Sequence, residues 1–334
     1  MTKTRLSIII AVVMALSLVA APMAYGAAGD VGGSFAAKNK LPEVTALVAP
    51  AMTPQAEWTT ITVTVSDKNK LVDVQEVHVE VFYDSIPSDP AAPGVANVQT
   101  CGILTATRTG PGAWNWTIDQ GTGTTWAINA AGCIPLPNDT LSSGDWVFSF
   151  KVGKVATESP GADNWDAYAK ARDTVGWGTV DRYDRDQEMN WYGEVTTAAS
   201  VVWGEVEPGT DFNGTNSKQT GVSVTYISNG AYDEKVKSSA AWSGATYTAN
   251  FDATGACTNA NEFSLMADDA AAYPGGAVQV TLAGALIDDT GAQTNEDGSG
   301  GGQVTTNTLW LKLAAVFNSD TYTGTITYII VDGS

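Results

Sequence analysis

The sequence predicts an all-β protein made of two tandem β-sandwich domains. Short segments in which apolar and polar residues alternate recur along the chain, and turn-forming residues separate them about every ten residues. No segment has a convincing helical period. The length of 334 residues suits two domains of roughly 100–200 residues each, and a hydrophobic content of 44% is enough to build their cores.

The N-terminus predicts export. Lys3 and Arg5 precede an apolar run over residues 6–21, and Ala24-Tyr25-Gly26 supplies a small-x-small cleavage site. This pattern is typical of a secretory signal peptide over residues 1–26, and the alternative, a retained membrane anchor, requires a longer apolar run. Cleavage would leave a chain with 15 basic and 36 acidic residues. We therefore expect an extracellular or cell-surface protein with no membrane span in its mature form.

Residues 27–42 are rich in Gly, Ala and Lys and are predicted to be a flexible leader. The first sandwich is expected over residues 43–180. Val77, Val79 and Val81 share one face of a predicted strand, as the period of two in a half-buried strand requires. Predicted strands of this domain cover residues 58–65, 74–83, 103–107, 113–118, 146–152 and 165–172. The last of these also has a helix-compatible composition, but its small and apolar residues alternate as in a strand.

The charged segment 181–188 is predicted to be a linker, because charge density peaks there while apolar residues become rare. The second sandwich is expected over residues 189–334. Its predicted strands cover residues 190–195, 202–206, 222–227, 245–251, 277–282, 309–317 and 322–330.

Two segments carry a family resemblance. Residues 62–84, TVTVSDKNKLVDVQEVHVEVFYD, resemble part of the immunoglobulin-like domains of secreted prokaryotic cell-surface proteins, and residues 146–150 supply the aromatic-x-aromatic strand found later in such domains. Residues 201–209, with the Asn-Gly turn at 229–230, are similar to the start of another surface-protein sandwich. The resemblance implies an immunoglobulin-like first domain and a role in a surface layer, stalk, adhesin or fibre.

Composition excludes several function classes. A formal charge of −19 argues against binding to a nucleic-acid backbone, and the single His78 excludes zinc sites with several histidines. No phosphate-binding loop, dinucleotide fingerprint or nucleophile elbow occurs. Adjacent carboxylates such as Asp268-Asp269 point to opposite faces of a strand. We therefore do not expect an enzyme, although carboxylates converging in a cleft between the domains would make one.

Calcium is the one cofactor that the acidic loops suggest, because hard cations prefer oxygen ligands. Asp67, Asn69 and Asp73 lie in one predicted loop, and Asp184 and Asp186 lie in the charged segment, where an ion would join the two domains. Neither set matches an EF-hand. The alternative is an Asx turn in the loop and a solvated linker.

Export also makes the cysteines and sequons relevant. Cys101 and Cys133 are predicted to form a disulfide, and the alternative is two buried thiols. Cys257 is expected to be a buried thiol. N-glycosylation sequons occur at three positions and matter only in a host that glycosylates its surface proteins; these are Asn115, Asn138 and Asn213.

These observations predict an exported, non-enzymatic surface protein with a structural or adhesive role, whose partners are itself or other surface proteins. Strand addition by the leader is a less suitable variant, since Val31 and Phe35 are its only large apolar residues before Leu41. The alternative is a secreted carbohydrate-binding protein whose exposed aromatic rings stack on glycans. Its candidate rings are Trp114, Trp116, Trp126 and Trp177.

Overall fold

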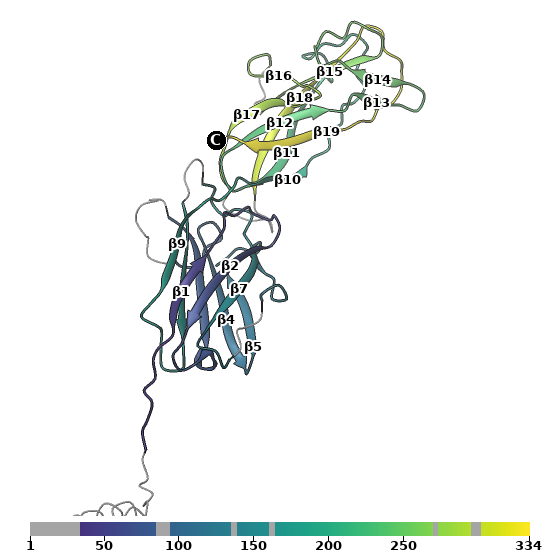
Figure 1. Cartoon of the computed structure of the whole chain (residues 1–334). Helices are drawn as coiled ribbons and strands as arrows, with labels where there is room; N and C mark the ends of the chain where they lie inside the picture. The colour runs from purple at the N-terminus through teal and green to yellow at the C-terminus, as the bar shows by residue number, and fades with distance from the viewer. Residues whose placement is uncertain (1–33, 85–93, 135–138, 160–163, 270–272, 295–301) are drawn as a thin grey trace, which may run out of the picture. The chain divides into compact units, whose positions relative to one another are not determined.

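The computed structural model describes residues 34–84, 94–134, 139–159, 164–269, 273–294 and 302–334. The predicted signal peptide and residues 27–33 of the predicted leader lie outside the described residues, and residues 34–42 of the leader form neither strand nor helix. Strands dominate, and the described part of the chain contains no α-helix, only a 3-10 turn η2 at Leu71–Asp73. The expected all-β class is therefore confirmed. Residues from Lys40 onward form one compact unit, within which the strands gather in two groups (Figure 1).

Two sheets form the first group, here called the first half (residues 40–188). A four-stranded sheet has the order β1-β2-β7-β6, and a five-stranded sheet has the order β5-β4-β3-β8-β9. The strands are β1 (Glu43–Val48), β2 (Thr59–Ser66), β3 (Glu76–Tyr83), β4 (Cys101–Gly110), β5 (Ala113–Asp119), β6 (Ala127–Ile128), β7 (Ser143–Lys151), β8 (Trp165–Arg172) and β9 (Arg182–Gln187).

The two sheets of the first half enclose a common apolar core. Alternation places Ile61, Val63 and Val65 of β2 inside, where they are fully buried, and β7 pairs antiparallel with β2 so that Val63 lies opposite Trp146. Val79 of β3 and Ala169 of β8 belong to the same buried cluster. A two-layer arrangement of this kind is consistent with the expected sandwich.

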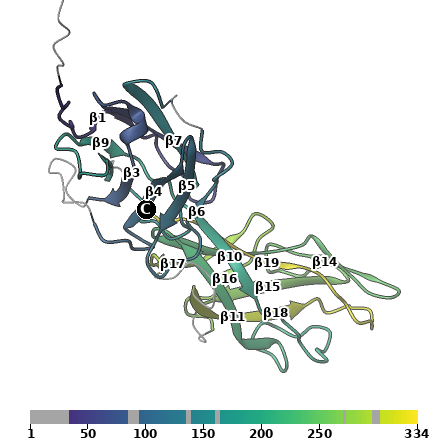
Figure 2. The ribbon, with the colours of Figure 1, turned by 90° about the horizontal axis from the view of Figure 1, so that it is seen from below.

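The second group, here called the second half (residues 189–334), is also seen in Figure 2, and its strands form two sheets. A seven-stranded sheet follows the path β10-β11-β18-β15-β14-β13 with β16 paired to β15, and a three-stranded sheet has the order β17-β12-β19. The strands are β10 (Gly193–Ala198), β11 (Lys218–Ser228), β12 (Tyr232–Ser238), β13 (Ala241–Ser243), β14 (Thr248–Phe251), β15 (Glu262–Asp268), β16 (Val278–Gln279), β17 (Ala285–Gly291), β18 (Gln303–Leu313) and β19 (Ile326–Asp332). Side chains from both sheets form the second core.

Several predicted elements differ from the structure. The segment expected to be a linker contains β9, whose residues pair with β8 as an edge strand of the five-stranded sheet. Its charges suit an edge strand, whose unpaired side reaches water, and none of its residues is buried. Residues 165–172, whose composition also suited a helix, form a strand, as the alternation of their small and apolar residues predicts. Residues 202–206 are not a strand, and the indole of Trp203 instead donates to Ser217 O at 2.9 Å.

Candidate functional site

The loop proposed for calcium, between β2 and β3, is closed by its own side chains. Asp67 is buried, and its Oδ1 accepts a hydrogen bond from Asn69 N at 2.7 Å, which is the Asx turn given as the alternative. Asn69 Oδ1 accepts from Lys40 N at 2.6 Å. Burial raises the pKa of Asp67, with Asp73 and Asp173 as nearby carboxylates. Calcium at this loop stays a prediction.

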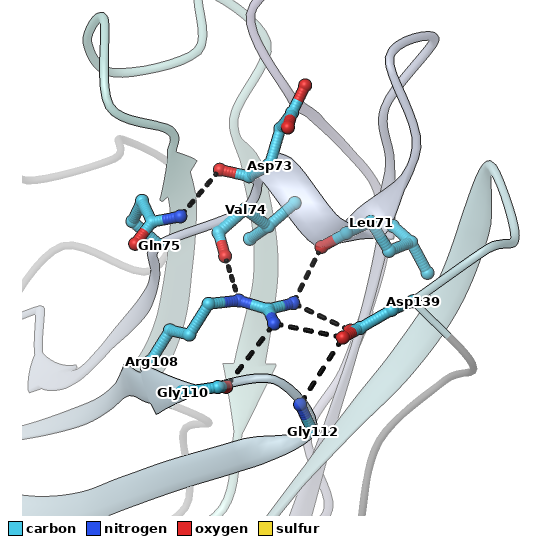
Figure 3. Close-up of polar contacts among 8 residues, drawn as sticks. All are labelled: Leu71, Asp73, Val74, Gln75, Arg108, Gly110, Gly112 and Asp139. Atoms are coloured by element: carbon cyan, nitrogen blue, oxygen red, sulfur yellow. Dashed lines mark hydrogen bonds and ion pairs between the residues drawn. The ribbon is translucent and has the colours of Figure 1, made fainter.

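A guanidinium cross-links the same end of the first half (Figure 3). Arg108 Nε donates to Val74 O at 2.9 Å, and one terminal nitrogen donates to Leu71 O at 2.9 Å and to Asp139 Oδ1 at 2.7 Å. The other terminal nitrogen contacts Asp139 Oδ2 at 3.1 Å and Gly110 O at 3.4 Å. These bonds lower the pKa of the Asp139 carboxyl. A fixed side-chain cation thus joins three segments, as a bound metal ion would.

The second acidic set does not converge either. Asp184 Oδ2 accepts from Ala49 N at 2.6 Å, which ties β9 to the residue after β1. Asp186 is exposed, has a left-handed φ of 60°, and donates its N–H to Asp166 Oδ1 at 3.1 Å. In the described part of the chain, no group of three or more His, Cys, Asp or Glu side chains is arranged to hold a metal ion.

The predicted disulfide is wrong, since Cys101, Cys133 and Cys257 are all free, buried thiols. Cys101 packs with Phe82 on the outer face of the five-stranded sheet. Cys133 Sγ accepts from Ser149 N at 3.3 Å, on the outer side of β7. The core of the first half therefore separates the two sulfurs. Burial raises the pKa of Cys101 to about 12 and of Cys257 to about 11, so both stay protonated and unreactive at neutral pH.

The predicted sugar-binding aromatics fall into two groups. Trp114 and Trp116 of β5 point inward, making edge contacts with Trp146 and Phe148 at centroid distances of 5.4 and 5.0 Å. Trp126 is buried and donates its indole N–H to Val98 O at 2.9 Å. Only Trp177 of the predicted set is exposed to a sizeable extent, at 39%.

The sequons have accessible positions where the structure describes them. Asn115 lies on the outer face of β5, the edge strand of its sheet, and Asn213 lies in an exposed loop. Asn138 is outside the described residues. Glycosylation stays a prediction.

A buried polar site joins the two halves and centres on Asn229. This side chain is fully buried, and its amide donates to Ala156 O at 2.9 Å and to Asn190 O at 3.0 Å. Its Oδ1 accepts from Tyr192 N at 2.6 Å. Its backbone carbonyl accepts from Glu158 N at 2.9 Å. The sequence indicated only an Asn-Gly turn at this position, because the partners are distant along the chain.

Main-chain hydrogen bonds extend this junction. Asn190 N donates to Met52 O at 2.9 Å, and Ser159 N donates to Met189 O at 3.0 Å. A salt bridge of 2.5 Å between Lys154 and Glu194 lies in the same region. Ile227, from the second half, is fully buried within the first core.

One carboxyl, that of Glu158, is buried at the junction. Glu158 is buried against Gly230, where a Cβ would collide with its Oε2. Burial, together with the nearby carboxylate of Asp332, raises the pKa of Glu158 to about 7. No ion-pair partner of Glu158 occurs among the described residues.

Comparisons with known proteins found no matching family model, no matching curated protein and no matching solved structure. Among the described residues, no helix has the length and apolar character needed to cross a membrane.

Proposed function

We propose that this chain is an exported, non-catalytic structural or adhesive protein of a cell surface, with an immunoglobulin-like first half. The strand order supports the fold assignment. In a variable-type immunoglobulin domain one sheet has the order A-B-E-D and the other extends the C-F-G sheet with two further strands. Lettering β1 to β9 in chain order produces the same two sheets here. The B–F disulfide of antibody domains has no counterpart in this chain.

The junction is the observation that carries the structural role. A protein that transmits force or keeps a fixed spacing needs its modules joined by more than a flexible linker. Here several main-chain hydrogen bonds, the buried amide of Asn229 and the buried Ile227 connect the halves. Such contacts restrict hinge motion between domains, which suits a spacer or a lattice subunit.

Charge suggests how assembly would be controlled. A chain with a formal charge of −19 repels copies of itself, and divalent cations screen or bridge this repulsion. The proposal therefore predicts self-association that depends on calcium. Sedimentation velocity of the chain from Ala27 onward, first with millimolar Ca²⁺ and then with a chelator, tests it.

Large species that form with calcium and disperse with chelator would support a self-assembling surface protein, and electron microscopy would then show their order. A monomer under both conditions would contradict self-assembly. An Asn229→Ala variant adds a second comparison. If the fixed junction matters, this variant assembles less or without order, although the substitution removes no side chain of either apolar core.

Glycan binding is the second candidate function. The specific observation in its favour is that two tryptophan rings, Trp58 and Trp177, remain 44% and 39% exposed on an exported protein. Exposed tryptophan offers an apolar, flat surface with a polar N–H, on which the apolar face of a sugar ring stacks.

A further inference from the structure

An open depression lies beside the start of β2. It has a volume of about 550 Å³ and is lined by Ala56, Glu57, Trp58 and Lys151. Trp58 precedes β2, and Lys151 ends β7, the strand paired with β2. Ala56 contributes only a methyl group to this lining.

The turn that precedes Trp58 is held by specific hydrogen bonds. Gln55 adopts a left-handed φ of 56°, and its amide nitrogen donates to Thr125 O at 2.9 Å and to Val152 O at 2.8 Å. Ala56 N donates to Thr53 O at 3.3 Å and closes the turn. The left-handed backbone of Gln55 and its two amide hydrogen bonds order the turn that leads into Trp58, and an ordered turn loses less entropy on binding.

Two charged side chains, Glu57 and Lys151, line the depression together with the ring. The ammonium of Lys151 lies 5.1 Å from the Trp58 ring centroid. Within the part of the chain that the structure describes, neither Lys151 nor Glu57 has an ion-pair or hydrogen-bond partner through its charged group. The site therefore offers a hydrogen-bond donor, an acceptor and an apolar ring.

Trp177 does not offer the same opportunity. Lys170 lies 4.8 Å and Arg172 lies 5.4 Å from its ring centroid, and His78 makes an edge contact at 6.1 Å. Three side chains thus already contact the Trp177 ring, against one for Trp58. Trp177 is thus a matched control for Trp58, with similar exposure and different surroundings.

We propose that the Trp58 depression binds a neutral hexopyranose unit of a glycan. A pyranose ring has an apolar C–H face for the indole and hydroxyl groups at its rim. Glu57 accepts a hydrogen bond from one hydroxyl, and Lys151 donates to another. The cation–π contact of Lys151 is a weak, solvent-exposed one, so the ammonium moves aside at little cost.

Electrostatics favours a neutral sugar over an acidic one. Lys151 alone would attract a uronate, but the chain has a formal charge of −19, and Glu57 lines the same depression. A polyanionic glycan would experience repulsion from the whole molecule within a Debye length of about 8 Å at physiological ionic strength. A neutral polysaccharide experiences none.

This inference rests on the second candidate function, and affinity electrophoresis tests it separately from assembly. Gels containing soluble mixed-linkage β-glucan, dextran or mannan supply neutral hexose polymers, and a polygalacturonate gel supplies the acidic comparison. The wild type should be retarded by at least one neutral polymer and not by polygalacturonate. Trp58→Ala should weaken that affinity about tenfold or more, as truncation of a central aromatic contact does, and Trp177→Ala should leave it unchanged.

The results separate the possible failures. Retardation lost with Trp177→Ala and kept with Trp58→Ala would overturn this site while leaving glycan binding intact. No retardation of the wild type by any neutral polymer would overturn both the site and the glycan function, without bearing on calcium-dependent assembly. Retardation by polygalacturonate alone would overturn the neutral class. If Trp58→Ala does not fold, Glu57→Gln and Lys151→Ala, both at exposed or half-exposed positions, each should weaken retardation.

Discussion

Arg108 shows how one side chain organises one end of the first half. Its guanidinium is 8% exposed and bonds to the carbonyls of Leu71, Val74 and Gly110 as well as to Asp139. Removing it would leave these acceptors and a carboxylate without their donor. Breaking such a pair costs far more than losing a surface ion pair.

We therefore expect Arg108→Ala to lower the free energy of unfolding by about 3 kcal/mol. The matched control is Arg172→Ala, because Arg172 also pairs with one carboxylate, Glu76 at 2.6 Å, but is 44% exposed. It should cost no more than about 1 kcal/mol. Urea denaturation of the three proteins measures both values, and equal losses would contradict the buried role of Arg108.

In the second half, Glu234 is a buried charged residue held by polar side chains. It is fully buried, Asn307 Nδ2 donates to its Oε1 at 2.6 Å, and Tyr226 and Thr305 are polar neighbours of the same carboxyl. Burial raises the pKa of Glu234. A group whose pKa is higher in the folded protein stabilises it below the unfolded pKa, and that contribution is lost as pH rises through the folded value.

The melting temperature of a Glu234→Gln variant should therefore depend less on pH than that of the wild type. The wild type should lose melting temperature as pH rises above the ordinary glutamate range, and the variant should lose less over the same interval. Thermal unfolding monitored by circular dichroism between pH 4 and about 8 covers this window. An identical slope in both proteins would show that Glu234 titrates normally.

Close packing of an aromatic ring against glycines also holds individual strands in place, and no sequence pattern predicts this contact. Trp126 is buried against Gly102 of β4 and against Gly153, and a Cβ at either glycine would collide with its ring. Both glycines are needed for this approach, rather than for an unusual backbone.

Gly102→Ala should therefore destabilise the protein by about 1–3 kcal/mol, the usual range for overpacking a core. Gly110 ends the same strand, and a Cβ there would meet nothing within 4 Å. Gly110→Ala is thus the control and should change stability by no more than about 0.5 kcal/mol. Chemical denaturation compares the two, and a neutral Gly102→Ala would mean that the ring shifts freely.

Strands with regular alternation were predictable, and the others were not, for physical reasons. The valines of β3 point into the core at every second position, so the pattern is visible in the sequence. In β12 the inward residues include Glu234 and Ser238, so polar core residues hide the strand. In β9 most residues are charged and reach solvent, which made the strand look like a linker.

The candidate sites were less predictable than the strands. The Asx turn at Asp67 is local and was an anticipated alternative. Arg108 and Asp139 are 31 positions apart, and Asn229 and Ala156 are 73 positions apart. Sequence motifs detect residues that lie close together along the chain, whereas these partners meet only in the tertiary fold.

For the molecule as a whole, the junction decides whether the two halves act as one. Most of its bonds are neutral and independent of pH, but Glu158 is buried there beside Asp332, with a pKa raised to about 7 from an ordinary value of 4.5. Protonated, Glu158 is a neutral group in a tight contact with Gly230. Ionised, it adds a buried negative charge next to another carboxylate.

The junction should therefore weaken as pH rises from about 4.5 toward 7. Over this interval Glu158 loses its proton more readily in the unfolded chain than in the folded one, so deprotonation favours unfolding. Glu158→Gln keeps the shape and removes the charge, so this variant should be more stable than the wild type at pH 8, by on the order of 1–2 kcal/mol, and equal to it near pH 4. Asp332→Asn should produce a smaller gain, because burial is the larger cause of the shift. Differential scanning calorimetry at both pH values tests this, and an advantage of Glu158→Gln that does not grow with pH would mean that the junction carboxyl is already solvated. Suppose that the stability advantage of Glu158→Gln grows with pH, and that this variant still assembles at an alkaline pH at which the wild type does not. The junction would then make assembly depend on the pH of the medium.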